Sequence, residues 1–131
     1  MNDQRGPPDV LLLTDAAPAQ RPILTFLREL GCRVDVTDIG AIAAALAFDE
    51  GYHLVVIRRL GPPGDLPAVL SRVTSMPERR CAVFLCTNLP PPPVELDAFF
   101  PEPLDMGRFR EATFALFRRL RLRVIRPVRN R

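Results

Sequence analysis

The side chains that most often carry out metal and thiol chemistry are few in this chain and poorly spaced for it. The 131 residues contain three cysteines, Cys32, Cys81 and Cys86, and one histidine, His53. No Cys-x-x-Cys pair occurs, so a zinc site has no recognisable ligand set. We therefore predict no metal site, and we interpret the cysteines as small apolar residues of buried strands. For His53 we expect a place at a strand edge or on the surface.

Other catalytic signatures are also missing from the sequence. All 18 basic residues are arginine, so any mechanism that needs a lysine amine, such as a Schiff base or a P-loop, is excluded. No glycine-rich loop follows a predicted strand, and no serine or threonine lies in a nucleophile-elbow context. We predict that the protein is not an enzyme and needs no cofactor.

Length and composition fit one folded domain. The chain has a mass of 14.7 kDa and is 47% hydrophobic, which is enough apolar material for a core. No apolar run approaches the roughly 20 residues of a membrane-spanning helix. Residues 1–8 are polar and lack the pattern of a secretion signal. We expect a soluble cytoplasmic protein with no transmembrane segment.

Short apolar runs alternate with amphipathic segments along the chain. Strands are predicted over residues 9–14, 32–37, 54–57 and 81–86, with a stub at 99–100. Helices are predicted between Pro22 and Leu30, between Asp38 and Gly51, between Asp65 and Pro77, and after Asp105. Alternating strands and helices with short connections form a parallel sheet covered on both faces. The fold class is therefore α/β with three layers.

From about Pro8 to Leu122 this layout resembles the receiver domain of bacterial response regulators, the CheY-like fold. The resemblance implies a doubly wound sheet of five parallel strands in the order 2-1-3-4-5. Where that family has an acidic pair after the first strand, this chain has Thr14 and Asp15. Where the family has its phospho-accepting aspartate, this chain has Arg58.

Three further positions carry the comparison. Pro62 matches a proline that follows the acceptor position, and Thr87 matches the family's serine or threonine at the end of the fourth strand. The family's Lys-Pro after the fifth strand corresponds to Glu102-Pro103. The stretch between Thr87 and Glu102 is short and contains Pro90 to Pro93, which cannot continue a helix. We predict that the fourth helix is shortened or replaced by this proline-rich segment.

These substitutions remove the chemistry that the resemblance would imply. A receiver accepts a phosphoryl group on a carboxylate with Mg²⁺ held by acidic side chains, and Mg²⁺ prefers anionic oxygen ligands. Arg58 is permanently cationic and has no acceptor atom, and Glu102 would repel a phosphoryl group. An unpaired buried charge is costly, so we hypothesise that Arg58 pairs with Asp15, with Glu102 or with both. The alternative, in which Arg58 points into solvent, stays open.

The charge distribution divides the chain into a body and a basic end. We predict a flexible N-terminus over residues 1–8, a receiver-like domain over 9–122 and a basic C-terminal tail over 123–131. Between Arg118 and Arg131 the sequence contains seven arginines and no acid. The basic residues of this region are Arg119, Arg121, Arg123, Arg126, Arg129 and Arg131, beside Arg118. Arginine at this density can bind phosphates in nucleic acid or at an anionic surface.

The resemblance also implies where partners would bind. Receivers meet their partners through the fourth helix, the fifth strand and the fifth helix. In this chain that face would carry Leu96, Phe99, Phe100, Met106, Arg108, Arg110 and Arg118. We interpret the chain as a pseudo-receiver, a phosphorylation-independent protein–protein interaction module in bacterial signal transduction with a signalling protein as partner.

Other interpretations remain open at the level of sequence. Nucleic acid or an anionic surface could bind through the arginine-rich end, and a small anion could bind near Arg58 at the strand ends. A homodimer also stays open.

Overall fold

The computed structural model describes residues 6–14, 21–38, 51–60, 64, 66–74 and 81–124. The helix predicted between Asp38 and Gly51 lies outside the described residues. So do Asp15, Pro62 and Asp65.

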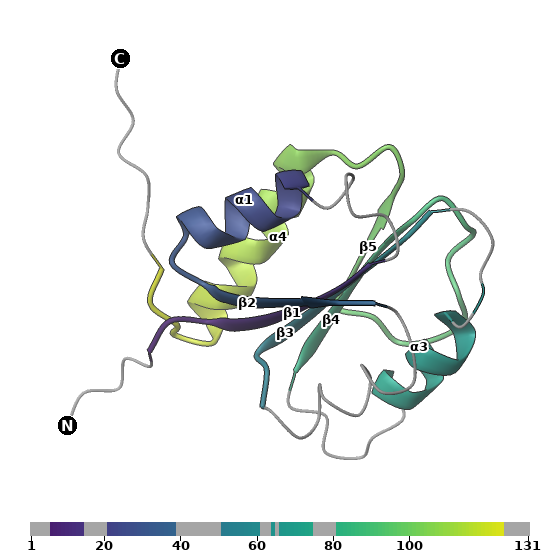
Figure 1. Ribbon diagram of the computed structural model, residues 1–131, viewed down its shortest axis with the longest axis horizontal. Coiled ribbons are helices and arrows are strands. Elements are labelled where there is room, and N and C mark those ends of the chain that lie inside the picture. Colours follow the sequence, from purple (N-terminus) through teal and green to yellow (C-terminus); the bar gives the residue numbers. More distant parts are fainter. Residues whose placement is uncertain are drawn as a thin grey trace.

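A five-stranded parallel sheet forms the centre of the domain (Figure 1). The strands are β1 (Asp9–Thr14), β2 (Arg33–Thr37), β3 (Leu54–Arg59), β4 (Ala82–Thr87) and β5 (Ala98–Pro101). Each neighbouring pair is parallel, and the order is β2-β1-β3-β4-β5. The predicted doubly wound order is thereby confirmed, and the predicted stub at residues 99–100 is a strand of four residues.

Helices cover both faces of the sheet (Figure 1). Helices α1 (Arg21–Glu29) and α4 (Met106–Arg119) lie on one face, and α3 (Leu66–Thr74) lies on the other. Residues of β1, β3 and β4 are buried on both faces, as expected for central parallel strands. In the described part of the chain, no helix is long and apolar enough to cross a membrane.

Aromatic rings form the centre of the core between the sheet and α4. Phe109 of α4 is fully buried, and its ring centroid lies 6.0 Å from that of Phe84 and 5.3 Å from that of Phe100. Phe26 of α1 meets Phe109 edge to face at 6.1 Å. Such tilted and edge-to-face pairs are favourable beyond the area that they bury. They fix the position of α4 against both β5 and α1.

The connection from β4 to β5 contains no helix over residues 88–97, which confirms that the proline-rich segment replaces a helix. Its apolar residues pack on the α3 side of the sheet, and they include Leu89, Val94 and Leu96. Asp97 fixes the start of β5. Its N–H donates to the Val83 carbonyl at 3.0 Å, and its Oδ2 accepts from the Val83 N–H at 2.8 Å.

Helix α4 is capped at both ends. The Asp105 carboxylate accepts hydrogen bonds from the N–H groups of Gly107 (2.9 Å) and Arg108 (3.3 Å), as its predicted N-cap role requires. At the other end Leu122 N–H donates to Phe117 O at 3.0 Å, and Arg121 has a φ of 58°. This is a Schellman motif with arginine at the left-handed position that glycine usually occupies.

The packed chain continues beyond the predicted boundary at residue 122. Leu122 is buried, and Val124 packs against the core on the α4 side. The N–H of Arg123 donates to the carbonyl of Gly6 at 3.4 Å. The segment after α4 is therefore attached to the body of the domain as far as Val124.

Replacing Arg121 by glycine should stabilise the fold. A residue with a Cβ costs about 1–2 kcal/mol in the left-handed region. Glycine avoids this cost, but its greater freedom in the unfolded chain offsets part of the gain. We expect Arg121→Gly to raise the free energy of unfolding by about 0.5–1 kcal/mol in urea titrations. The control Arg118→Gly removes the same charge inside the helix and should lower it by about 1 kcal/mol. Destabilisation by both variants would contradict the assignment of Arg121 to a left-handed position that favours glycine.

Candidate functional site

Polar side chains gather where the central strands end. Thr14, Arg58 and Thr87 lie at the carboxyl ends of β1, β3 and β4, and all three are buried. Thr14 is paired in register with Arg58, and Arg59 with Thr87. In doubly wound folds ligands bind at this edge of the sheet, so this is the candidate functional site.

The centre of the site is a two-point ion pair between Arg58 and Glu102. Arg58 Nε lies 2.8 Å from Glu102 Oε2, and Nη2 lies 3.0 Å from Oε1. Only 10% of the Arg58 side chain and 8% of the Glu102 side chain are exposed. Parallel hydrogen bonds of this kind are among the strongest between side chains. The sequence left open whether Arg58 pairs with Asp15, with Glu102 or with both, or points into solvent. In the structure Arg58 pairs with Glu102. Asp15 lies outside the described residues.

The pair connects segments on either side of β4. Arg58 belongs to β3 and Glu102 directly follows β5, while β4 lies between these strands in the sheet. Glu102 Oε1 also accepts a hydrogen bond from the Leu104 N–H at 3.0 Å. A third contact, from the Glu102 N–H to the Thr87 carbonyl at 3.1 Å, ties the same residue to β4. Glu102 therefore holds β3, β4 and the approach to α4 together.

Thr87 is engaged locally at the end of β4. Its Oγ1 accepts a hydrogen bond from the Leu89 N–H at 3.2 Å, and the residue is 1% exposed. Thr87 thus satisfies the backbone at the start of the proline-rich segment.

Cys86 lies beside the ion pair and is fully buried. Burial and the nearby Glu102 carboxylate raise the pKa of its thiol to about 12, although Arg58 acts in the opposite direction. A thiol with this pKa is protonated at neutral pH and is a poor nucleophile. This agrees with the interpretation of Cys86 as a small apolar residue.

As far as the described residues form it, the site does not fit the Mg²⁺ ion that a receiver fold implies. Mg²⁺ prefers several anionic oxygens, whereas the carboxylate of Glu102 is already bound to a guanidinium. Among the described residues, no three histidine, cysteine or acidic side chains come together in a way that could hold a metal. The permanent charge of Arg58 opposes a cation at the same place.

Of the seven residues predicted to form an interaction face, Phe100 is buried, which corrects the prediction for that residue. Phe100 is 6% exposed and belongs to the aromatic core, because its position in β5 turns it toward α4. The Arg110 guanidinium lies over the Phe26 ring at 5.5 Å, since helical periodicity directs it toward α1.

The other members of the set are divided between the two faces of the sheet and the surface. Leu96 and Phe99 pack on the α3 side, and Met106 packs on the α4 side. Arg108 and Arg118 are exposed.

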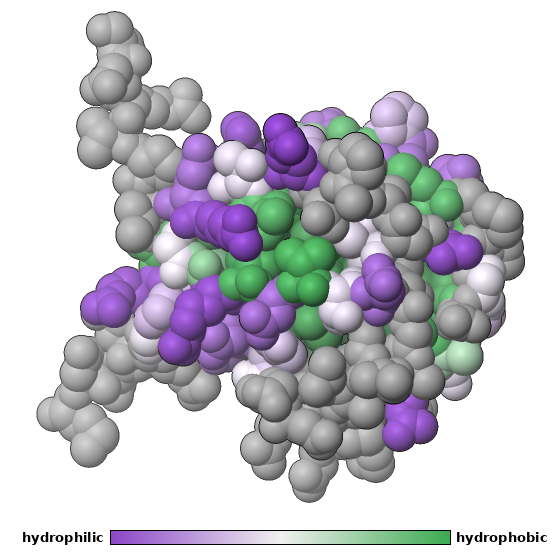
Figure 2. Space-filling model, viewed as in Figure 1, coloured by the Kyte–Doolittle hydropathy of each residue, from purple (hydrophilic) through white to green (hydrophobic). Residues whose placement is uncertain are grey.

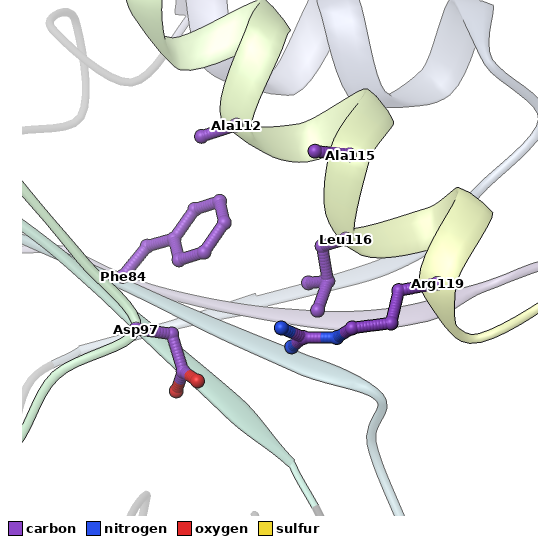
Figure 3. A pocket seen from close by; sticks show the side chains of 6 residues that line it. All are labelled: Phe84, Asp97, Ala112, Ala115, Leu116 and Arg119. Atoms are coloured by element: carbon purple, nitrogen blue, oxygen red, sulfur yellow. The ribbon is translucent and has the colours of Figure 1, made fainter.

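Further pockets among the described residues lie away from the ion pair. One, of about 310 Å³, lies between α4 and the strands (Figure 3). It is lined by Phe84, Asp97, Ala112, Ala115, Leu116 and Arg119. Figure 3 shows the Arg119 side chain extending from the helix toward the strands, while the Asp97 carboxylate points away from the helix.

The second pocket, of about 300 Å³, lies between α3 and the proline-rich segment. Its lining is mainly apolar and includes Leu66, Leu70, Thr87, Pro90 and Pro93.

Several interactions at the amino end of the sheet were not predicted. His53 Nδ1 accepts a hydrogen bond from the Asp9 N–H at 2.9 Å, and the Tyr52 hydroxyl donates to Asp35. Arg33 forms an ion pair with Asp9 at 2.7 Å. These contacts join residues far apart in sequence, so no local pattern could have revealed them.

The predicted basic residues are only partly described. Arg119, Arg121 and Arg123 are exposed. Arg126, Arg129 and Arg131 lie outside the described residues.

Comparison with known proteins identifies the fold. No protein-family model and no curated protein matches the chain. The receiver domain of Francisella response regulator 1452 superposes with a TM-score of 0.71 at 20% identity, covering 86% of this chain and 98% of its own. The receiver domain of a Pseudomonas aeruginosa sensor histidine kinase, solved with magnesium in its active-site cleft, gives 0.69 at 19%, covering 87% and 98%.

The pseudo-receiver domain of the CikA protein is also similar. It gives a TM-score of 0.56 at 19% identity and covers 83% of this chain and 96% of its own. The chain therefore has the fold of receiver domains.

A double-mutant cycle tests the coupling of the buried pair. Removing one partner leaves an uncompensated charge, so Arg58→Met and Glu102→Gln should each lower the free energy of unfolding by about 3–5 kcal/mol. The double variant should cost at least about 1 kcal/mol less than the sum of the singles in urea titrations.

The exposed pair of Arg33 and Asp9 provides a matched control. In the cycle Arg33→Met with Asp9→Asn the coupling should stay below about 1 kcal/mol. A coupling at Arg58 and Glu102 no larger than this would show that the buried pair is not a structural connection.

The raised pKa of Cys86 predicts a loss of stability in alkali. The folded state holds the thiol proton more tightly than the unfolded chain, whose thiols titrate near 9. The resulting stabilisation is complete below about pH 9 and is lost as pH rises toward about 12. Between about pH 9 and 10.5 the wild type should lose about 2 kcal/mol more than Cys86→Ala. Equal losses would contradict the prediction.

Proposed function

We propose that this chain is a pseudo-receiver, a phosphorylation-independent protein–protein interaction module in signal transduction, and that it is not an enzyme. The observation that carries this proposal is the buried ion pair of Arg58 and Glu102 at the strand ends. The place where a receiver would accept a phosphoryl group holds a guanidinium that is already neutralised by a carboxylate. Neither group can form an acyl phosphate in this arrangement, because Arg58 has no acceptor and Glu102 is bound.

The ion pair also supports a fixed conformation at this edge. A conventional receiver would change shape when a phosphoryl group creates new contacts at the strand ends. Here the contacts between β3 and the residue after β5 exist already, made by charged groups that are about nine-tenths buried. Any change of conformation would then depend on partners that bind one state better than another.

The comparisons support the proposal through the fold. A domain of this fold that is named a pseudo-receiver, that of the CikA protein, is among the similar structures. We infer the signalling role and the bacterial setting of this chain from those of the named receivers.

A small anion at Arg58 is a weaker alternative. Two nitrogens of the guanidinium already bind the buried Glu102 carboxylate, which neutralises the charge that would attract an anion. We therefore favour the interaction module over a ligand site at this position.

Treatment with a small phosphodonor tests the proposal directly. Acetyl phosphate and Mg²⁺ should leave the intact mass of the wild-type chain unchanged, because Arg58 stands at the acceptor position and the Glu102 carboxylate is bound to it. A conventional receiver treated in the same solution should gain one phosphoryl group. A phosphoryl adduct on an aspartate of this chain would overturn the proposal.

A binding measurement completes the experiment. Host proteins that the immobilised chain retains should be retained equally with and without phosphodonor and Mg²⁺. Glu102→Gln, which disrupts the ion pair, should retain less, whereas Asp9→Asn, which removes an exposed acid, should not. Retention that rises with the phosphodonor would contradict phosphorylation independence.

A further inference from the structure

We propose that the end of α4 and the segment after it bind the phosphate backbone of duplex nucleic acid without regard to sequence. The surface consists of Arg118, Arg119, Arg121 and Arg123, here called the basic rim. All four residues are exposed. Between residues 112 and 131 the sequence contains no acid. This inference does not rest on the proposed function, because it uses no residue of the Arg58 site.

The basic rim belongs to the folded body. The Schellman motif at the end of α4 sets the direction of the chain, and Leu122 inserts into the core. The backbone contact from Arg123 to Gly6 attaches the next residue to the start of the domain. Arg121 and Arg123 flank the buried Leu122 and are exposed on the outer side. The arginines therefore have defined places, which reduces the entropy lost when they bind a rigid partner.

Two of the neighbouring acids, Asp9 and Asp97, are already engaged. The carboxylate of Asp9 is paired with Arg33, and Asp97 accepts a hydrogen bond from the Val83 N–H. Glu111 and Glu29 are the further acids of α4 and α1, and the last turn of α1 adds Arg28. The amino end of the sheet is thus richer in positive than in negative groups. In Figure 2 hydrophilic side chains gather at the side of the molecule where β1 begins.

The backbone at Arg121 gives a second reason to regard the rim as more than a solvated surface. Glycine fits the left-handed position of a Schellman motif without steric cost, and arginine does not. Strained positions that persist in a fold are reasonable grounds for a hypothesis of function. At this position the side chain adds a guanidinium to the rim and nothing to the core, since Arg121 is exposed.

The character of the surface favours a duplex over other anionic partners. Arginine binds phosphate with two parallel hydrogen bonds. Among the described residues the one large hydrophobic side chain that is exposed is Val36, in the edge strand β2. The rim therefore offers no aromatic platform for single-stranded bases and no apolar wedge for a lipid bilayer. It also lacks the apolar anchor typical of protein interfaces.

Binding of the full chain to a fluorescent DNA duplex of about 20 base pairs, measured by anisotropy, tests the proposal. Four phosphate contacts should weaken the affinity on the order of 100-fold between about 50 and 200 mM NaCl. The variant Arg121→Gly/Arg123→Gln should reduce the slope of log K against log salt by about 2. Glycine at 121 removes the charge and also suits the local backbone, so loss of folding does not confound this variant.

A charge-matched variant serves as the control. Arg21→Gln/Arg72→Gln removes two exposed arginines from α1 and α3 and should leave the slope unchanged. Equal effects of the two double variants, or absence of duplex binding at about 50 mM salt, would overturn the proposal. Binding to polyglutamate, or to phosphatidylcholine vesicles with about 30% phosphatidylserine, as tight as to the duplex would overturn it in favour of another anionic partner.

Discussion

The buried ion pair between Arg58 and Glu102 is the interaction on which the functional interpretation depends. Two charged groups lose most of their water in this arrangement, and their mutual hydrogen bonds and the Leu104 N–H help to replace it. Apolar residues of similar volume are often at least as stabilising as a buried pair. The distinctive property of the pair is its geometry, because a two-point hydrogen bond fixes both the distance and the orientation of the segments that it joins.

That geometry is coupled to the loss of a helix. Between β4 and β5 the chain runs without helix over residues 88–97, and Leu89, Val94 and Leu96 cover the α3 side of the sheet. The segment is held at one end by Thr87 and at the other by Asp97, each through hydrogen bonds to neighbouring backbone. Glu102 then follows β5 directly. The residue after the edge strand β5 is thereby attached to β3, to β4 and to the approach to α4.

The sequence predicted the parts of the fold that local patterns determine. The apolar runs at residues 9–14 and 54–57 are long enough to identify strands buried on both faces, and Asp105 marks the start of a helix. The charge reversal at Arg58 and Glu102 was visible as two substitutions, and the cost of an unpaired buried charge predicted a partner for Arg58. The sequence did not show that Glu102 is the partner of Arg58, or that Glu102 also accepts a hydrogen bond from Leu104. Both depend on the path of the chain after β5.

The failures of prediction have equally specific causes. Phe100 was assigned to a surface because the sequence of a four-residue strand does not say which side chains face the core. Arg110 was assigned to the interaction face, and the rotation of α4, set by Phe109 and Phe117 in the core, places its guanidinium over the Phe26 ring. The Schellman motif after α4 was not recognised in the sequence because such a motif is usually identified by its glycine, and here Arg121 takes that place.

The two ends of the sheet carry opposite electrostatic arrangements. At the carboxyl end a cation and an anion neutralise each other in a buried site. At the amino end the last turn of α1 contains Arg28, and the last turn of α4 contains Arg118 and Arg119. Cations at these helix ends interact favourably with the helix dipoles. This effect on stability is enough to explain the positive charges of those three residues. Arg121 and Arg123 lie beyond the last turn, where the dipole effect has fallen off, so the helix dipole does not account for their exposed charges.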